Sequence, residues 1–268
     1  MLEYAPSLAG DERVRRSYPD PIQYTRLAQP GALFVYDSIR TVIFDLDGTL
    51  VFHEPDSADV IRGFCAEIGR PLSAEVERQV RRRRHAYFLD STVRDRLPGL
   101  SSDDFWLEFN HYLLEVVCAQ GDLDGLARQL TARYAQLELT YYCPDVVRHT
   151  LAELRSRGYR LGLITNRLNV GSFNELLLEV DLYDQFELAL ASGEVGVHKP
   201  YPGIFAIALE RMGAEPGESL YVGDNYWADV VGARRAGLTP ALLDPLRLFP
   251  EADCLVLDRV SDLLERLC

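Results

Sequence analysis

The pattern of hydrophobic and polar residues divides the chain into three parts. Residues 1–40 are rich in proline, tyrosine and charge and show little periodicity, which predicts an N-terminal extension with one short helix near Asp11–Arg16. Residues 41–54 and 143–268 alternate short apolar runs with helical segments, whereas residues 55–142 show helical spacing only. The pattern therefore predicts an α/β core interrupted by an all-helical insert of about 90 residues, large enough to be a small domain.

The insert is expected to contain four helices and no strand. Breaks are expected at glycine and proline, and Ser101 and Ser102 ahead of two acidic residues are typical of a helix N-terminus. The helices are predicted at Asp59–Ile68, Ala74–Phe88, Asp103–Ala119 and Leu123–Leu139.

The core is predicted to begin with a buried strand over Thr41–Asp45 and then to alternate helices with strands. Such alternation is typical of a parallel sheet covered on both faces. Further strands are predicted at Tyr159–Thr165, Phe186–Ser192, Ser219–Asp224, Thr239–Asp244 and Cys254–Asp258. Helices are predicted at Pro144–Arg157, Phe173–Glu179, Pro202–Met212, Ala228–Ala236 and Ser261–Leu267.

Polar residues follow the first four of these strands. Parallel sheets bind ligands at the carboxyl ends of their strands, so these residues are expected to meet at one edge. They are Asp45 and Asp47, then Thr165, Asn166 and Arg167, then His198 and Lys199, and finally Asp224 and Asp229.

Asp45 and Asp47 alone allow other interpretations. Asp47-Gly48 between apolar runs is also a β-hairpin signal. A calcium-binding loop would require glycine where Leu50 stands, which excludes that site. The hairpin explains only one of the polar groups at the strand ends, so we favour a common site.

The residue types at this edge suit phosphoryl transfer. Several carboxylates with one ammonium can bind a hard divalent cation, for which Mg²⁺ is suited. One carboxylate can act as a nucleophile, and a second can donate and accept protons. A hydroxyl, an amide and backbone N–H groups can hold phosphoryl oxygens, with lysine as a compact charge.

Composition narrows the partners. The length corresponds to about 1.8 domains, and a net charge of −13 argues against nucleic acid as a partner. No apolar run approaches the ~18 residues of a membrane span, and the start has no signal-peptide layout. Five scattered cysteines fit a reducing cytoplasm. We therefore expect a cytoplasmic protein that acts on a small phosphorylated metabolite. Its oligomeric state stays open.

Four motifs resemble those of the haloacid dehalogenase-like hydrolases. They are DLDGTL at 45–50, ITN at 164–166, Lys199 within HKPYPGIF, and GDNYWAD at 223–229. All four stand in the family's order, and the resemblance covers residues 41–268. Lys199 is moreover the only lysine among 28 cationic residues. The resemblance implies a Rossmann-like three-layer core and identifies the helical insert as a C1 cap.

The resemblance also implies a role for each motif residue. Asp45 is expected to be the nucleophile and Asp47 the general acid/base. Thr165 and Asn166 would bind the phosphate, and Lys199 would neutralise both Asp45 and the substrate. Mg²⁺ would be held by Asp45, the Asp47 carbonyl and Asp224, with Asp229 supporting the metal's waters.

Departures from family patterns narrow the activity further. Dehalogenase members lack the second aspartate, so Asp47 favours a phosphatase, and the insert lacks the lysine of phosphonate-cleaving members. A phosphosugar mutase and a catalytically idle binding module stay as alternatives. In the insert, most of the run Arg81–Arg84 is expected to be solvated, although one or two of its arginines could reach the cleft and meet an anionic leaving group. The segment Arg84–Arg96 is the first candidate for substrate selection.

Overall fold

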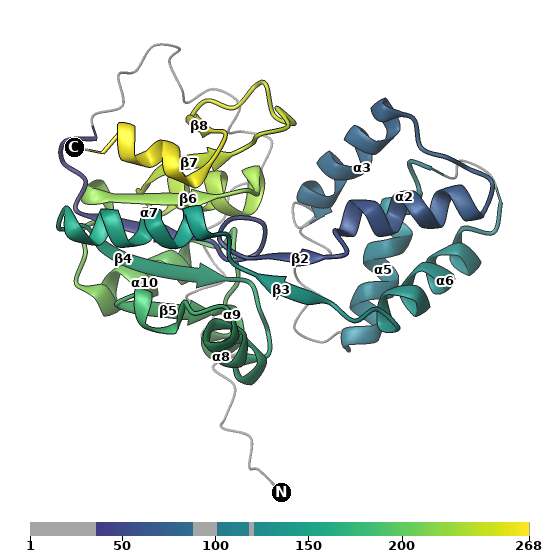
Figure 1. Ribbon diagram of the computed structural model, residues 1–268, viewed down its shortest axis with the longest axis horizontal. Coiled ribbons are helices and arrows are strands. Elements are labelled where there is room, and N and C mark those ends of the chain that lie inside the picture. Colours follow the sequence, from purple (N-terminus) through teal and green to yellow (C-terminus); the bar gives the residue numbers. More distant parts are fainter. Residues whose placement is uncertain (1–35, 88–100, 118–120, 268) are drawn as a thin grey trace, which may run out of the picture.

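The protein is described by a computed structural model that covers residues 36–87, 101–117 and 121–267. The predicted helix at Asp11–Arg16 and most of the segment Arg84–Arg96 lie outside these residues. The chain forms two lobes, an α/β lobe and a helical lobe, joined by two thin strands (Figure 1). Within the described residues, none of the helices is long and apolar enough to cross a membrane.

The α/β lobe is built on a parallel sheet of six strands. Its strands are β1 (Thr41–Phe44), β4 (Arg160–Thr165), β5 (Leu188–Ala191), β6 (Ser219–Gly223), β7 (Thr239–Leu243) and β8 (Leu255–Leu257). They lie in the order β5-β4-β1-β6-β7-β8, and every pairing is parallel. The predicted α/β fold class with a parallel sheet is confirmed.

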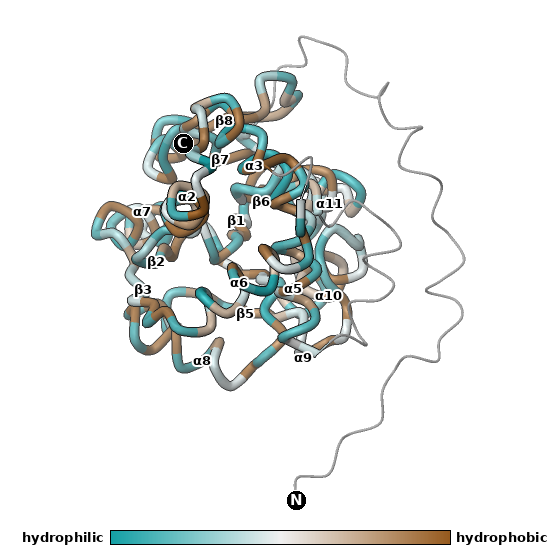
Figure 2. Tube along the Cα trace, turned by 90° about the vertical axis from the view of Figure 1, so that its right-hand side faces the viewer, coloured by the Kyte–Doolittle hydropathy of each residue, from teal (hydrophilic) through white to brown (hydrophobic). Residues whose placement is uncertain are grey.

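Helices cover both faces of this sheet because its strands are apolar on both sides. Val42 and Phe44 of β1 face α7 (Asp145–Ser156), α8 (Val170–Glu179) and the 3₁₀ helix η7 (Val260–Glu265). Ile43 points the other way, towards α10 (Pro202–Met212) and α11 (Gly232–Arg235). Figure 2 shows hydrophobic and hydrophilic residues alternating along helices such as α7. Short helices lie at Tyr183–Gln185, Ser192–Val195 and Pro216–Glu218.

The helical lobe has a hydrophobic core of its own. It contains α2 (Ser57–Glu67), α3 (Ala74–Ala86), α5 (Ser102–Leu114) and α6 (Leu123–Ala135). Each begins at an Asp or Ser whose side chain accepts a backbone N–H of the first turn, which fixes the start of the helix. The four predicted helices are present, although each ends before its predicted last residue. The inward-facing side chains include Phe64, Leu113 and Leu130.

Two short strands that the sequence pattern did not predict connect the lobes. β2 (Phe52–Glu54) pairs antiparallel with β3 (Thr140–Tyr142). The expectation that residues 55–142 contain no strand is therefore wrong at residues 140–142. Each strand has only three residues, too few for a pattern of alternation, and the partners lie far apart in the sequence. Because β1 pairs only in parallel, a hairpin at Asp47-Gly48 is also absent from the described sheet.

The segment after β6 departs from a regular α-helix. The prediction placed a helix over Ala228–Ala236, but a π-helix, η6 (Tyr226–Val231), comes first and leads into α11. The side chain of Asn225 accepts the backbone N–H groups of Trp227 and Ala228, which fixes the start of the π-helix. The closing helix, η7, also departs from α-helical geometry and is a 3₁₀ helix.

The helical lobe also contacts the loop that follows β7. Arg78 donates to the carbonyl groups of Leu246 and Arg247, and Arg82 donates to the carbonyl of Leu248. The guanidinium of Arg82 lies 5.1 Å from the ring centre of Phe249. The arginine run therefore contributes to the contact between the lobes.

The other arginines of the run differ in their partners. Arg81 pairs with Glu77, and Arg83 pairs with Glu115 of the same lobe. Arg84 is exposed.

Candidate active site

The predicted site lies at the carboxyl edge of three neighbouring strands. Asp45 directly follows β1, Thr165 ends β4, and Asp224 directly follows β6. Since β4, β1 and β6 are adjacent in the sheet, these residues meet at one edge. The backbone N–H of Asp45 donates to the carbonyl of Val222, which extends the pairing of β1 with β6 by one residue. Asp45 is thus held on a rigid element.

Lys199 lies at the centre of a buried ion cluster. Its ammonium is 2.6 Å from Oδ1 of Asp45, 2.6 Å from Oδ1 of Asp229 and 2.9 Å from the hydroxyl of Tyr221. Burial alone would lower the pKa of Lys199, but Asp229 and Asp45 outweigh it and raise that pKa well above its usual value. The ammonium therefore stays charged.

Side chains of the sheet fix the position of Lys199. The amide of Asn166 accepts the backbone N–H of Lys199 at 2.7 Å and donates to the Lys199 carbonyl at 3.0 Å. The hydroxyl of Tyr221 donates to the carbonyl of Ile164 at 3.2 Å. Both polar atoms of the Asn166 side chain are thus bonded to the loop that carries the lysine.

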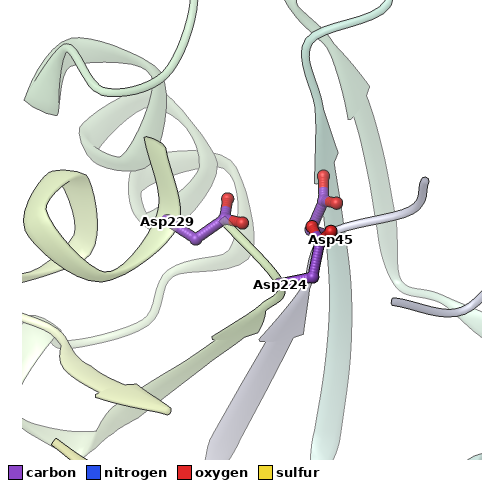
Figure 3. A group of neighbouring side chains, drawn as sticks. All are labelled: Asp45, Asp224 and Asp229. Atoms are coloured by element: carbon purple, nitrogen blue, oxygen red, sulfur yellow. The ribbon is translucent and has the colours of Figure 1, made fainter. Parts of the chain in front are cut away.

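Three carboxylates, those of Asp45, Asp224 and Asp229, gather at this edge of the sheet (Figure 3). Oxygens of Asp45, Asp224 and Asp229 lie within 4.8 Å of one another. Burial raises the pKa of Asp45 to about 7 against the opposing charge of Lys199. Desolvation, then the charges of Asp45 and Asp229, raise the pKa of Asp224 well above its usual value. Without a cation the cluster therefore resists ionisation of all three carboxyl groups, because Lys199 supplies only one positive charge.

Two glycines make room for these carboxylates. A Cβ at Gly48 would lie 2.6 Å from Oδ2 of Asp224, and Gly48 has a φ of +83° that side chains rarely adopt. A Cβ at Gly223 would lie 2.2 Å from Oδ2 of Asp229. The glycines of both aspartate motifs are thus required by close packing around the site.

The donor set fits a hard divalent cation. Carboxylate oxygens are the ligands that Mg²⁺ prefers, and a cation would relieve the repulsion between Asp45 and Asp224. Both oxygens of Asp229 are engaged, Oδ1 by Lys199 and Oδ2 by the N–H of Asn225 at 2.9 Å, whereas Lys199 takes only Oδ1 of Asp45. Asp45 and Asp224 are therefore the carboxylates best placed to hold a metal.

Asp47 lies in a different environment from Asp45. Its two oxygens accept hydrogen bonds from Arg167, at 2.9 Å from Nε and 2.6 Å from Nη2. The side chain of Asp47 is 43% exposed, against 9% for Asp45. One aspartate of the motif is thus buried with lysine, and the other is half-exposed with arginine.

Most of the site residues predicted from the sequence lie together in the structure, but two of their partners were not predicted. Asp45, Asp224, Asp229 and Lys199 are joined as the motifs indicated. The pairing of Arg167 with Asp47 was missed, although its position directly after the ITN motif was a signal. Tyr221 gave no signal, because a tyrosine inside a buried apolar strand resembles any core residue.

Comparison with known proteins gives the family. Residues 39–237 match the haloacid dehalogenase-like hydrolases. A phosphoserine phosphatase of Thermus thermophilus is 30% identical over 226 residues, which cover 77% of this chain and 89% of that protein. A glyceraldehyde 3-phosphate phosphatase of Methanopyrus kandleri is 42% identical over 95 residues, 35% of this chain and 40% of that protein.

Solved structures share the fold. An L-2-haloacid dehalogenase superposes with a TM-score of 0.57 at 23% identity, covering 85% of this chain and 98% of that one. At this identity the likeness shows the fold alone. The family match extends over most of the chain and shows the family as well as the fold, which confirms the prediction from the four motifs. The chain belongs to the haloacid dehalogenase-like hydrolases.

Proposed function

We propose that this chain is a Mg²⁺-dependent phosphatase that hydrolyses a small phosphomonoester through an aspartyl-phosphate on Asp45. The observation that carries the proposal is the bonding of Asp45 to the buried ammonium of Lys199, with Asp47 two residues further on. Two relatives are named as phosphatases of phosphoserine and glyceraldehyde 3-phosphate, which are small phosphate esters. These names support the substrate class and not a particular substrate.

In the first step a carboxylate oxygen of Asp45 attacks phosphorus, and the bond from phosphorus to the leaving oxygen breaks. Asp47 gives its proton to that oxygen, so that an alcohol leaves. Lys199 provides positive charge beside both Asp45 and the phosphoryl group. The Thr165 hydroxyl would hold a phosphoryl oxygen. Asn166 would do so through its backbone N–H, because both polar atoms of its side chain are already bonded to the backbone of Lys199.

In the second step water attacks the phosphoryl group, and Asp47 accepts the water's proton. Inorganic phosphate leaves and the Asp45 carboxylate is regenerated. Mg²⁺, held by Asp45, Asp224 and the Asp47 carbonyl, would neutralise charge on the phosphoryl oxygens. Asp229 would hold Lys199 in place and support the metal's waters.

The helical lobe would act as a cap over this edge. We take residues 55–142 as the cap, residues 41–54 and 143–268 as the catalytic core, and residues 1–40 as an extension. The cytoplasmic location stays a prediction.

The test is phosphate release from nitrophenyl phosphate and a panel of small phosphorylated metabolites. We expect turnover with Mg²⁺, none in excess chelator, and recovery when Mg²⁺ is returned. Calcium should substitute poorly because Ca²⁺ is a larger ion and its coordination geometry is less strict. Undiminished turnover in chelator would remove the metal from the mechanism. Isomerisation of a hexose phosphate without hydrolysis would instead indicate a mutase.

A further inference from the structure

Arg167 holds both oxygens of the Asp47 carboxylate at once. Its Nε and Nη2 atoms donate to Oδ2 and Oδ1 of Asp47, at 2.9 and 2.6 Å. Paired hydrogen bonds from a planar guanidinium fix the rotation of a carboxylate as well as its distance, which a lysine cannot do. The side chain of Arg167 is 21% exposed, so most of it is withdrawn from water.

The backbone of Arg167 is fixed where it follows β4. Its carbonyl accepts the backbone N–H of Gly193 at 3.0 Å and the hydroxyl of Ser192 at 3.2 Å. Ser192 is itself buried. The guanidinium therefore extends from a well-bonded position to Asp47, and it does not belong to a free surface loop.

The guanidinium also contacts the connection between the lobes. The ring centre of Tyr141 lies 5.2 Å from Cζ of Arg167, a distance typical of a cation–π contact. Tyr141 is the middle residue of β3 and is the register partner of His53 in β2. The rings of Tyr141 and His53 meet edge to face at 5.7 Å. Asp47 is thus linked through Arg167 to the two strands that carry the helical lobe.

We propose that Arg167 is a positioning residue, which sets the orientation of the Asp47 carboxylate and holds it against the strands that lead to the helical lobe. The inference rests on the proposed function, in which Asp47 exchanges a proton with the leaving group and with water. Asp47 is half-exposed and has no strand of its own, so without Arg167 its side chain would sample several rotamers. Two alternatives are direct binding of the substrate phosphate by Arg167 and a purely structural ion pair.

Two substrates with different leaving groups distinguish a positioning role for Arg167 from these alternatives. The value of kcat/KM reports the steps through departure of the leaving group. An alkyl phosphate needs a proton there, but nitrophenolate does not. For Arg167→Gln we expect kcat/KM to fall ~10–10²-fold with an alkyl phosphate, as misplaced catalytic groups do. With nitrophenyl phosphate we expect a loss below ~3-fold, because no proton is transferred in that step. Equal losses with both substrates would overturn the proposal.

A double mutant tests whether Arg167 acts through Asp47. If it does, Arg167→Gln has little further effect in an Asp47→Asn background, because residues that act as a unit are not additive. A further loss of the same size, with weaker inhibition by inorganic phosphate, would show that Arg167 binds phosphate and would overturn the proposal. If Arg167→Gln fails to fold, Arg167→Lys supports the same comparison, because it keeps the charge and loses the paired geometry.

Two neighbouring tyrosines of β3 provide a test variant and its control for the contact between Arg167 and the strands that lead to the helical lobe. Tyr141→Leu should lower kcat/KM for the alkyl phosphate in the same selective way, by a smaller factor than Arg167→Gln. Tyr142, the next residue of the strand, is half-exposed, and Tyr142→Leu should leave kcat/KM unchanged for both substrates. Equal effects of the two leucine variants would overturn the link through Tyr141. No phosphate release from the wild-type protein with any substrate would instead overturn the proposed function, and the role of Arg167 with it.

Discussion

Asp45 and Asp47 are two residues apart in the sequence and lie in opposite environments. Asp45 extends a buried strand and shares a lysine with Asp229, whereas Asp47 lies in the turn after that strand and pairs with an arginine. The lysine cluster is almost closed to water, and the arginine pair is not. The difference suits a nucleophile that must not move and a proton carrier that must reach the leaving group. Four predictions test this contrast.

The largest effect is expected from removal of the fixed carboxylate. Asp45→Asn should reduce turnover to background, because an amide cannot attack phosphorus to give the covalent intermediate. Aspartyl-phosphate formation, followed by trapping with radioactive substrate, should disappear while the far-ultraviolet circular dichroism stays unchanged. Turnover that survives this substitution would mean that Asp45 is not the nucleophile.

Lys199→Arg should be nearly as damaging, and no better than Lys199→Ala. Arginine keeps the charge, but it is a longer, planar fork, and the cluster has room for a compact ammonium with three acceptors. A shift of ~1 Å at the nucleophile can cost ~10²-fold in rate. The exchange Arg62→Lys, at an exposed pair, is the control and should leave the rate unchanged. Wild-type kcat in Lys199→Arg would mean that charge alone suffices.

Asp47→Asn should have an intermediate effect that depends on the leaving group. We expect a loss of ~10²–10⁴-fold, the usual contribution of general acid–base catalysis. The loss in kcat/KM should shrink for nitrophenyl phosphate, which needs no proton. If Asp45→Asn and Asp47→Asn lower kcat/KM by the same factor with every substrate, the two aspartates do not divide their roles as proposed.

The smallest expected effect is on the stability of the metal-free protein. Folding raises the pKa of Asp45 to about 7, well above the ~3.9 of an unfolded chain, so the native state binds the proton more tightly between these values. Stability should therefore fall as the pH rises from about 4 to about 7. At pH 7.5 in chelator, Asp45→Asn should unfold at a higher temperature than the wild type.

Low pH and metal provide the controls for that measurement. The gap in unfolding temperature should narrow towards pH 4, where both proteins lack the charge. It should also narrow when Mg²⁺ is added, because a bound cation would offset the repulsion between carboxylates. A destabilised Asp45→Asn variant at pH 7.5 would mean that the ion pair with Lys199 outweighs the cost of burying the Asp45 charge and its repulsion by Asp229.

Most of the fold followed from patterns that are local in the sequence. The alternation of apolar runs and helical segments predicted the parallel sheet, and helix α10 was predicted at its observed bounds, Pro202–Met212. The ends of most other helices shifted by a few residues. The strands β2 and β3 were missed, because three residues carry too little pattern and their partner lies across the whole helical lobe.

The amino-acid sequence alone was enough to place Asp45 and Asp224 at the same edge of the sheet, because a polar group directly after a buried parallel strand lies at its carboxyl end. Lys199 and Asp229 lie further from their strands, and the order of the four motifs was needed to join them to this group. Two further pairs became visible only in the folded chain: Tyr221 with Lys199, and Arg167 with Asp47. The physical reason is that the identity of a strand-end residue is local, whereas a hydrogen bond between Asp47 and Arg167 depends on how the sheet places residues 120 positions apart.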